Sequence, residues 1–205
     1  MSLDSIQLST KKTVDDWKII RPKLVAGATS EVWADVVTDF YYDRLESRYL
    51  RPIKAIADAG SSAGEGFSIV AIQCSLVEFL ESCVQGINYV HYNPVAPYEY
   101  NKSREVFVAF LRKRDPFRTR FDDALAHDFY SAVRCGVLHE ACTKKTWRIW
   151  DESGPSLIVD PNGPILYRDD FQKAISDFIG TYRLSVPQDV ALQQAFIRKF
   201  DHLSK

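Results

Sequence analysis

The sequence lacks the features that mark metal-stabilised, disulfide-bonded and membrane-spanning proteins. Its four cysteines show no C-x2-C pair of the kind zinc sites use, so we expect reduced core or interface thiols and neither metal nor disulfide. The longest apolar stretches are interrupted by Gln73, Glu78, Glu81 and Arg134 well short of a bilayer's thickness. Residues 1–12 lack the apolar core of a signal peptide. The sequence therefore predicts a cytoplasmic protein without a cofactor.

An excess of charge of one sign is also absent. The chain has 26 lysines and arginines against 27 aspartates and glutamates, a formal net charge of -1. This balance argues against a protein whose whole surface binds nucleic acid. With 46% hydrophobic and 26% charged residues among 205, the chain is typical of a soluble globular protein large enough to bury a core.

Helical periodicity dominates the chain, so we expect a mainly α fold. A short helix should also follow Pro52 and end near Gly60. The runs SLIVD (156–160) and PILYR (164–168) flank Pro-Asn-Gly-Pro, which predicts a small β-hairpin. The longer expected helices lie at about 13–26, 30–49, 67–89, 103–111, 121–141, 169–182 and 187–202.

The clearest loop, SSAGEG at 61–66, suggests a boundary after the N-terminal helices. We expect three segments. Residues 1–60 form an N-terminal helical segment that packs on the core, residues 61–150 form the helical core, and residues 151–205 add the hairpin and the two C-terminal helices. The three together are expected to make one compact unit.

Residues suited to phosphodiester chemistry gather on the helix expected at 121–141, which carries Arg134 and His139. An arginine offers a phosphate a permanently charged fork of donors, and an imidazole exchanges protons near neutral pH. The plainer alternatives are a hydrogen-bonded core histidine and an arginine paired with Glu78, Glu81 or Glu140. Five residues on a helix leave the two side chains about 140° apart, so one helix alone makes a poor site.

Gly136 lies between the two motif residues, although glycine costs about 1 kcal/mol in a helix interior. Together with Cys135 it would let a second copy of this helix approach closely across a two-fold axis. Alternatively, it makes room for a bulky neighbour of the same chain such as Trp147. Both interpretations remain open from the sequence.

Basic residues flank the motif helix on both sides. Such runs are usually solvated surface, but their position beside the motif favours a polyanion such as RNA near this helix. The candidate RNA-binding residues are Arg112, Lys113, Arg114, Arg118, Arg120, Lys144 and Lys145.

The motif FYSAVRCGVLHEA (129–141), together with the apolar helix before it and its embedded acidic residue, resembles the HEPN superfamily (higher eukaryotes and prokaryotes nucleotide-binding domain) over about residues 67–148. The resemblance implies a helical bundle that dimerises, so that two R-x4-H motifs form one cleft. It also implies metal-independent endoribonuclease activity, often in toxins or defence systems, with Arg134 and His139 as the catalytic pair. Glu78 would orient the arginine. The chain departs from the family pattern at Cys135, where Asn, Asp or His is usual.

Two functions therefore stay open. One is a HEPN-type ribonuclease that acts as a homodimer on RNA, with a cognate inhibitor protein as a further partner. The other is a non-catalytic module that keeps the helical dimer and binds a nucleotide or a protein. The intact Arg134 and His139 favour the enzyme, whereas Cys135 and the near-neutral charge favour the binding module.

Overall fold

The computed structural model describes residues 6–25, 28–60 and 64–205, and these residues are mainly helical, as the periodicity predicts. Their contacts group into two compact units, which we describe separately. Unit 1 comprises Met1–Arg51, Ser82–Asn101 and Ile179–Lys205, and unit 2 comprises Pro52–Glu81 and Lys102–Phe178. These units group the chain differently from the three sequence segments, whose packing as one body stays a prediction. Residues 61–63 of the expected boundary loop lie outside the described residues.

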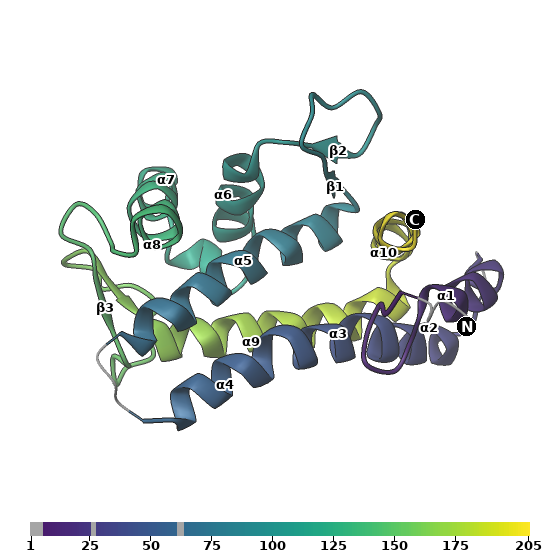
Figure 1. Cartoon of the computed structure of the whole chain (residues 1–205), viewed down its shortest axis with the longest axis horizontal. Helices are drawn as coiled ribbons and strands as arrows, with labels where there is room; N and C mark the ends of the chain where they lie inside the picture. Colours follow the sequence, from purple (N-terminus) through teal and green to yellow (C-terminus); the bar gives the residue numbers. More distant parts are fainter. Residues whose placement is uncertain (1–5, 26–27, 61–63) are drawn as a thin grey trace. The chain divides into compact units, whose positions relative to one another are not determined.

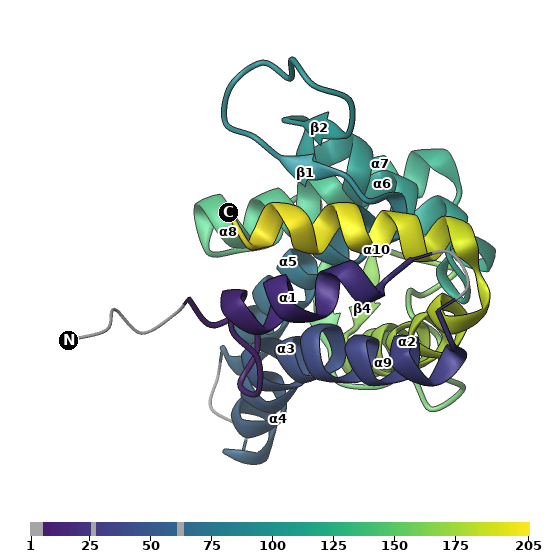
Figure 2. The ribbon, with the colours of Figure 1, turned by 90° about the vertical axis from the view of Figure 1, so that its right-hand side faces the viewer.

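Unit 1 is built on an aromatic core between its first and last helices. Trp17 of α1 lies 5.4 Å from Phe200 of α10, and Phe196 stacks on Phe200 at 4.4 Å. Figure 2 shows these two helices side by side. The Trp17 indole N–H also donates to Asp201 (3.0 Å), which fixes α1 on α10. The elements of this unit are α1 (Val14–Ile20), η1 (Arg21–Lys23), α2 (Ser30–Val36), η2 (Val37–Tyr42), α3 (Asp43–Leu45), η3 (Glu46–Leu50), β1 (Asn88–Tyr89), β2 (Glu99–Tyr100), η6 (Val186–Gln188) and α10 (Val190–Leu203).

The sequence led us to expect that the helix starting at Ser30 ends before Pro52. In the structure it continues past this proline. It continues through η2, α3 and η3 into α4 (Arg51–Asp58), so one helical path runs from Ser30 to Asp58. Both η2 and η3 are π-helical, and at the end of η3 the Arg51 N–H donates five residues back to Glu46. A proline in a helix clashes with the carbonyl four residues earlier. The widened turn before Pro52 relieves that clash, which explains why the helix persists.

Unit 2 has a phenylalanine core around Phe129. Its ring centroid lies 5.5 Å from Phe121, 5.4 Å from Trp147 and 5.7 Å from Phe171. These contacts hold the motif helix against its neighbours. The elements are the larger part of α5 (Glu65–Gln85), α6 (Ser103–Lys113), η4 (Phe117–Thr119), α7 (Asp123–Phe129), η5 (Tyr130–Arg134), α8 (Cys135–Glu140), β3 (Arg148–Trp150), β4 (Ile165–Tyr167) and the start of α9 (Arg168–Ser185).

The predicted C-terminal hairpin is only partly present. Its second run forms β4, but β4 pairs in parallel with β3, a strand that the sequence did not predict. The first run, 156–160, pairs with β4 through an isolated antiparallel bridge between Val159 and Leu166, and the Tyr167 hydroxyl donates to the Asp160 carboxylate (2.9 Å). The Ile165 N–H, which would complete the next pair by donating to the Asp160 carbonyl, donates instead to the Gly163 carbonyl (2.9 Å). One edge of β4 is therefore taken by β3, which follows directly on the motif helix and its turn.

Helix α5 is long and apolar enough to cross a membrane, yet 56% of its most apolar window is buried inside the protein. It also carries polar side chains with partners in the interior, although the buried Gln73 Oε1 accepts no hydrogen bond from the described residues. Gln73 donates to the Arg168 carbonyl (2.9 Å), and the fully buried Glu81 pairs with Arg114. These features are typical of the core helix of a globular protein. Cys74 and Cys83 are buried, Cys135 is half-buried and Cys142 is exposed, and all four thiols are free.

Candidate functional site

The motif helix forms where the sequence predicts it, as α7, η5 and α8 in succession (Figure 1). Asp122 caps its start by accepting a hydrogen bond from the Leu125 N–H (2.8 Å). Ala141 ends it in the left-handed region, with φ 54°. The middle turn, η5, is π-helical and ends at Arg134. Such widened turns occur frequently at functional sites.

Arg134 is held in a partly buried position on this helix. Its side chain is 17% exposed, its Nη2 lies 3.5 Å from Oε2 of Glu78 on α5, and its guanidinium stands over the Tyr130 ring at 5.2 Å. Its Nε is buried and has no hydrogen-bond partner in the part of the chain that the structure describes. Of the three carboxylates considered from the sequence, Glu78 is the one that pairs with it. Glu81 binds Arg114, and Glu140 binds Lys144.

His139 is exposed, so it is not the hydrogen-bonded core histidine of the plainer interpretation. Within the part of the chain that the structure describes, its ring makes no hydrogen bond or ion pair with any residue, Arg134 included. The helix geometry that separates the two side chains by about 140° accounts for this. One copy of the chain therefore presents the arginine and the histidine without bringing them together.

The surroundings of Gly136 distinguish the two interpretations that the sequence left open, a close approach of a second copy and a neighbour from the same chain. A Cβ there would lie 2.5 Å from the Cys142 carbonyl oxygen and 3.4 Å from Lys144. The chain turns back at Ala141, and the Lys144 N–H donates to the Ala132 carbonyl (2.9 Å). Gly136 thus makes room for backbone of its own chain, although not for Trp147. It no longer argues for a close crossing of two copies.

Gly136→Ala is expected to lower the free energy of unfolding by about 1–3 kcal/mol, because the new methyl group overlaps a backbone oxygen that cannot move aside freely. Urea denaturation measures this. Gly180→Ala on α9 is the matched control, since nothing lies within 4 Å of its added Cβ. That change should raise stability by about 1 kcal/mol through helix propensity. Equal stability of the Gly136→Ala and wild-type proteins would contradict the close intrachain packing.

Most of the candidate RNA-binding cations are already paired with carboxylates. Such pairs neutralise much of the basic surface and leave Lys113 and Arg120 as the two candidates without a carboxylate partner among the described residues. The pairs are Arg112 with Asp123, Arg114 with Glu81, Arg118 with Asp115, Lys144 with Glu140, and Lys145 with Asp128.

Two of these pairs have structural roles. Arg114 binds Glu81 through two hydrogen bonds of 2.8 Å, which raise the pKa of the guanidinium above its ordinary value. Asp128 accepts from Lys145 and from the Trp147 indole, and these hydrogen bonds hold the pKa of its carboxyl below the usual range. Arg114 and Lys145 therefore stabilise unit 2, whatever else they contact.

The fold adds a residue that the sequence analysis missed. Arg104 in the first turn of α6 places its guanidinium 5.6 Å from the centroid of the Tyr130 ring, the ring that Arg134 also contacts. Arg104 is exposed and has no carboxylate partner among the residues that the structure covers. No local signal could have found it, because α6 and η5 meet only in the folded unit.

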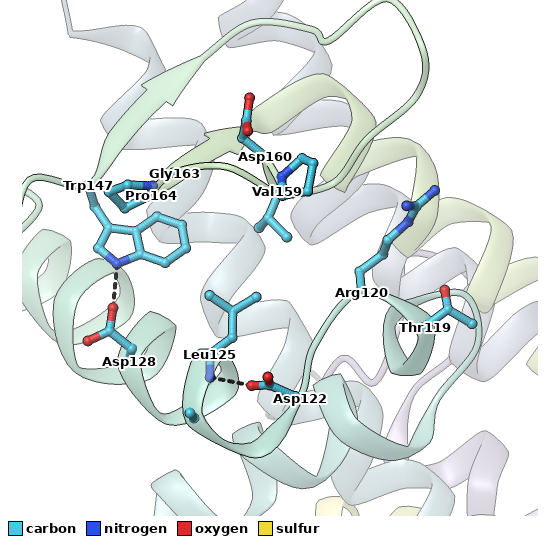
Figure 3. A pocket seen from close by; sticks show the side chains of 12 residues that line it. Thr119, Arg120, Asp122, Leu125, Asp128, Trp147, Val159, Asp160, Gly163 and Pro164 are labelled. Carbon is cyan, nitrogen blue, oxygen red and sulfur yellow. Dashed lines mark hydrogen bonds between the residues drawn. The ribbon is translucent and has the colours of Figure 1, made fainter.

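A cavity of about 590 Å³ opens beside the first turns of α7 (Figure 3). Leu125 and Val159 point toward each other across it, with Trp147 at one end and Arg120 at the other. Asp128 accepts the Trp147 indole N–H (2.7 Å) and so fixes this aromatic wall. The cavity has the size of a small-molecule pocket and an apolar floor.

Among residues 6–25, 28–60 and 64–205, no three His, Cys, Asp or Glu side chains come together in a group that could hold a metal ion. Comparison with protein-family models, with curated proteins and with solved structures finds no match. The candidate site is therefore argued from the residues of this chain alone. Its gathered side chains are Arg134, Glu78, Tyr130 and Arg104, and His139 is exposed further along the motif helix.

Proposed function

We propose that the chain is a HEPN-type, metal-independent endoribonuclease in the cytoplasm, with a toxin or defence role. One observation carries the proposal. Arg134 is held in place by Glu78, while His139, five residues later on the same helix, is exposed and has no partner among the described residues. The motif thus combines a fixed arginine with a proton-transfer group that is accessible to a substrate.

The chemistry follows from these two groups. The ribose 2'-oxygen attacks the adjacent phosphorus and loses its proton to one His139 imidazole, while the P–O5' bond breaks and the leaving O5' gains a proton from a protonated imidazole. Arg134 stabilises the negative charge that develops on the phosphorane oxygens. The products are a 2',3'-cyclic phosphate and a free 5'-hydroxyl.

A second copy of the chain completes this site in the proposal. Arg134 and His139 of one copy are not in contact, so each would meet its counterpart from a symmetric partner across a shared cleft. Gly136 does not support such an interface, because its close neighbour is the chain's own turn.

The test is an RNA cleavage assay with purified protein in excess EDTA. We expect cleavage of single-stranded RNA to persist in the chelator and to leave 2',3'-cyclic phosphate ends, which mass spectrometry identifies. Complete inhibition by EDTA, reversed by added metal, would contradict the mechanism. Cleavage of the same sequence made with 2'-O-methyl riboses would contradict it as well, because that substrate lacks the nucleophile.

A second function is favoured by a different observation. Five of the seven candidate RNA-binding cations are already paired with carboxylates, and the cavity beside Trp147 is large enough for a nucleotide or a side chain of a protein. These features suit a non-catalytic binding module. A well-folded wild-type protein that binds RNA or a mononucleotide without cutting any RNA would favour this function over the enzyme.

A further inference from the structure

We propose that Arg104 and Arg134 form a phosphate-binding site on the Tyr130 ring, and that its ligand is a backbone phosphate of RNA. The inference rests on the proposed function and deepens it, because it adds to the motif a residue from another helix. The three side chains come from α6 and from the two ends of η5, which pack together in unit 2.

The first argument is geometric. The guanidinium carbon of Arg104 lies 5.6 Å from the Tyr130 centroid, and that of Arg134 lies 5.2 Å from it. Tyr130 is itself fixed, since it is buried and its ring packs edge-on against Phe107 at 5.4 Å. Two guanidinium groups therefore lie within 5.6 Å of the centroid of one fixed aromatic ring. Paired planar donors of this kind suit the oxygens of a phosphate.

The second argument is the local charge. Two guanidinium groups share the ring, and Glu78 lies 3.5 Å from Arg134 as the carboxylate that pairs with it. Arg104 has no ion pair within the described part of the chain, unlike Arg112 on the same helix and Arg114 just after it. The cluster therefore keeps one positive charge in excess, and a bound anion would offset the repulsion between the two arginines.

The third argument is an unsatisfied donor. The Nε of Arg134 is buried and has no hydrogen-bond partner among the described residues, although burying a donor without a partner is unfavourable. The position of Arg104 is also unfavourable, because a cation in the first turn of α6 opposes the dipole of that helix. A bound anion would offset the unfavourable position of Arg104 at the start of its helix. Sites where local preferences conflict with the fold are typically functional.

Arg104 is exposed, so the site is open to solvent. A phosphodiester of RNA therefore fits the site better than a carboxylate of the chain itself would. Part of this site lies on the motif helix, which also carries His139. A phosphate held by Arg104 and Arg134 would fix the RNA strand on the motif helix. Arg104 then acts as a positioning residue for the proposed reaction.

The experiment measures binding without cleavage. The His139→Ala protein, alone and combined with Arg104→Gln, is titrated into fluorescein-labelled single-stranded RNA over a series of salt concentrations, with anisotropy as the readout. We expect Arg104→Gln to weaken binding about five- to tenfold at low salt and to reduce the log-log salt slope by about 0.7, the value for one lost phosphate contact. Arg104→Lys should restore the slope, since it keeps the charge.

Arg183→Gln is the matched control. Arg183 stands over the Tyr42 ring at 4.9 Å, so its replacement removes the same charge and the same kind of ring contact elsewhere. It should change neither affinity nor slope. An equal loss in the Arg183→Gln and Arg104→Gln proteins would show a general charge effect and overturn the site.

A second arm separates RNA from free phosphate. Inorganic phosphate alone is added at millimolar concentrations, and the thermal midpoint is compared between the wild-type and Arg104→Gln proteins. An Arg104-dependent rise with unchanged RNA binding would assign the site to free phosphate and overturn the RNA assignment. Unchanged RNA binding in an active nuclease would reject the site and keep the proposed function. Arg104-dependent RNA binding in a wild type that cleaves no RNA would keep the site and reject the nuclease.

Discussion

Replacing His139 with alanine is expected to reduce RNA cleavage by about 10²–10⁴-fold while leaving the fold intact. The side chain is exposed and makes no hydrogen bond or ion pair with the described residues, so its removal takes away a proton-transfer group without disturbing packing. Initial rates on a labelled single-stranded RNA measure the effect, and thermal unfolding checks stability. Full activity in the His139→Ala protein would refute the proposed mechanism.

His127→Ala provides the matched control for this experiment. His127 lies on the same helix, its side chain is 49% exposed, and its Nε2 is 3.9 Å from Asp123, so it is a second accessible imidazole outside the motif. We expect it to leave the rate unchanged. Arg134→Ala should abolish cleavage as well, but it also removes the partner of Glu78, so its stability must be measured beside its activity.

Arg114→Ala is expected to lower the free energy of unfolding by about 3 kcal/mol. It leaves the carboxylate of Glu81, which is fully buried, without its two charged hydrogen bonds. Urea denaturation followed by circular dichroism measures the loss. The expected loss of stability does not depend on the basic surface, because the substitution acts through a buried carboxylate.

Arg112→Ala, two residues earlier on α6, is the control for that prediction. Arg112 pairs with Asp123, whose side chain is 72% exposed, so its loss should cost less than about 1 kcal/mol. If both variants unfolded at the wild-type midpoint, the Glu81–Arg114 pair would not stabilise the protein. A weaker affinity of Arg114→Ala for RNA cannot be assigned to a lost phosphate contact unless its stability is restored.

Local patterns were sufficient to predict most helices. The apolar spacing at 121–141 predicted the motif helix, and the pattern from Ser103 predicted α6 nearly to its end. Periodicity could not predict the π-helical turns, because it assumes a fixed number of residues per turn. It also missed β3, where only three residues, Arg148–Trp150, find a partner in β4.

The site was harder to predict than the fold, for physical reasons. The Arg134–Glu78 pair was one of three options, and only the packing of α5 on the motif helix decides between them. Arg104 lies on another helix and gave no local signal. The close neighbour of Gly136 depends on the left-handed conformation of Ala141, which alanine does not indicate.

The π-helical turn at η5 has a consequence for how this chain is aligned with others. A turn of this kind holds about one residue more than a regular helical turn, so the helix after Arg134 is rotated relative to α7. A sequence with a regular helix would match this chain on both sides only if a one-residue gap were placed between Tyr130 and Arg134. An ungapped comparison that superimposes Arg134 and His139 on another R-x4-H motif therefore sets the buried positions of α7, such as Phe129, one residue out of register.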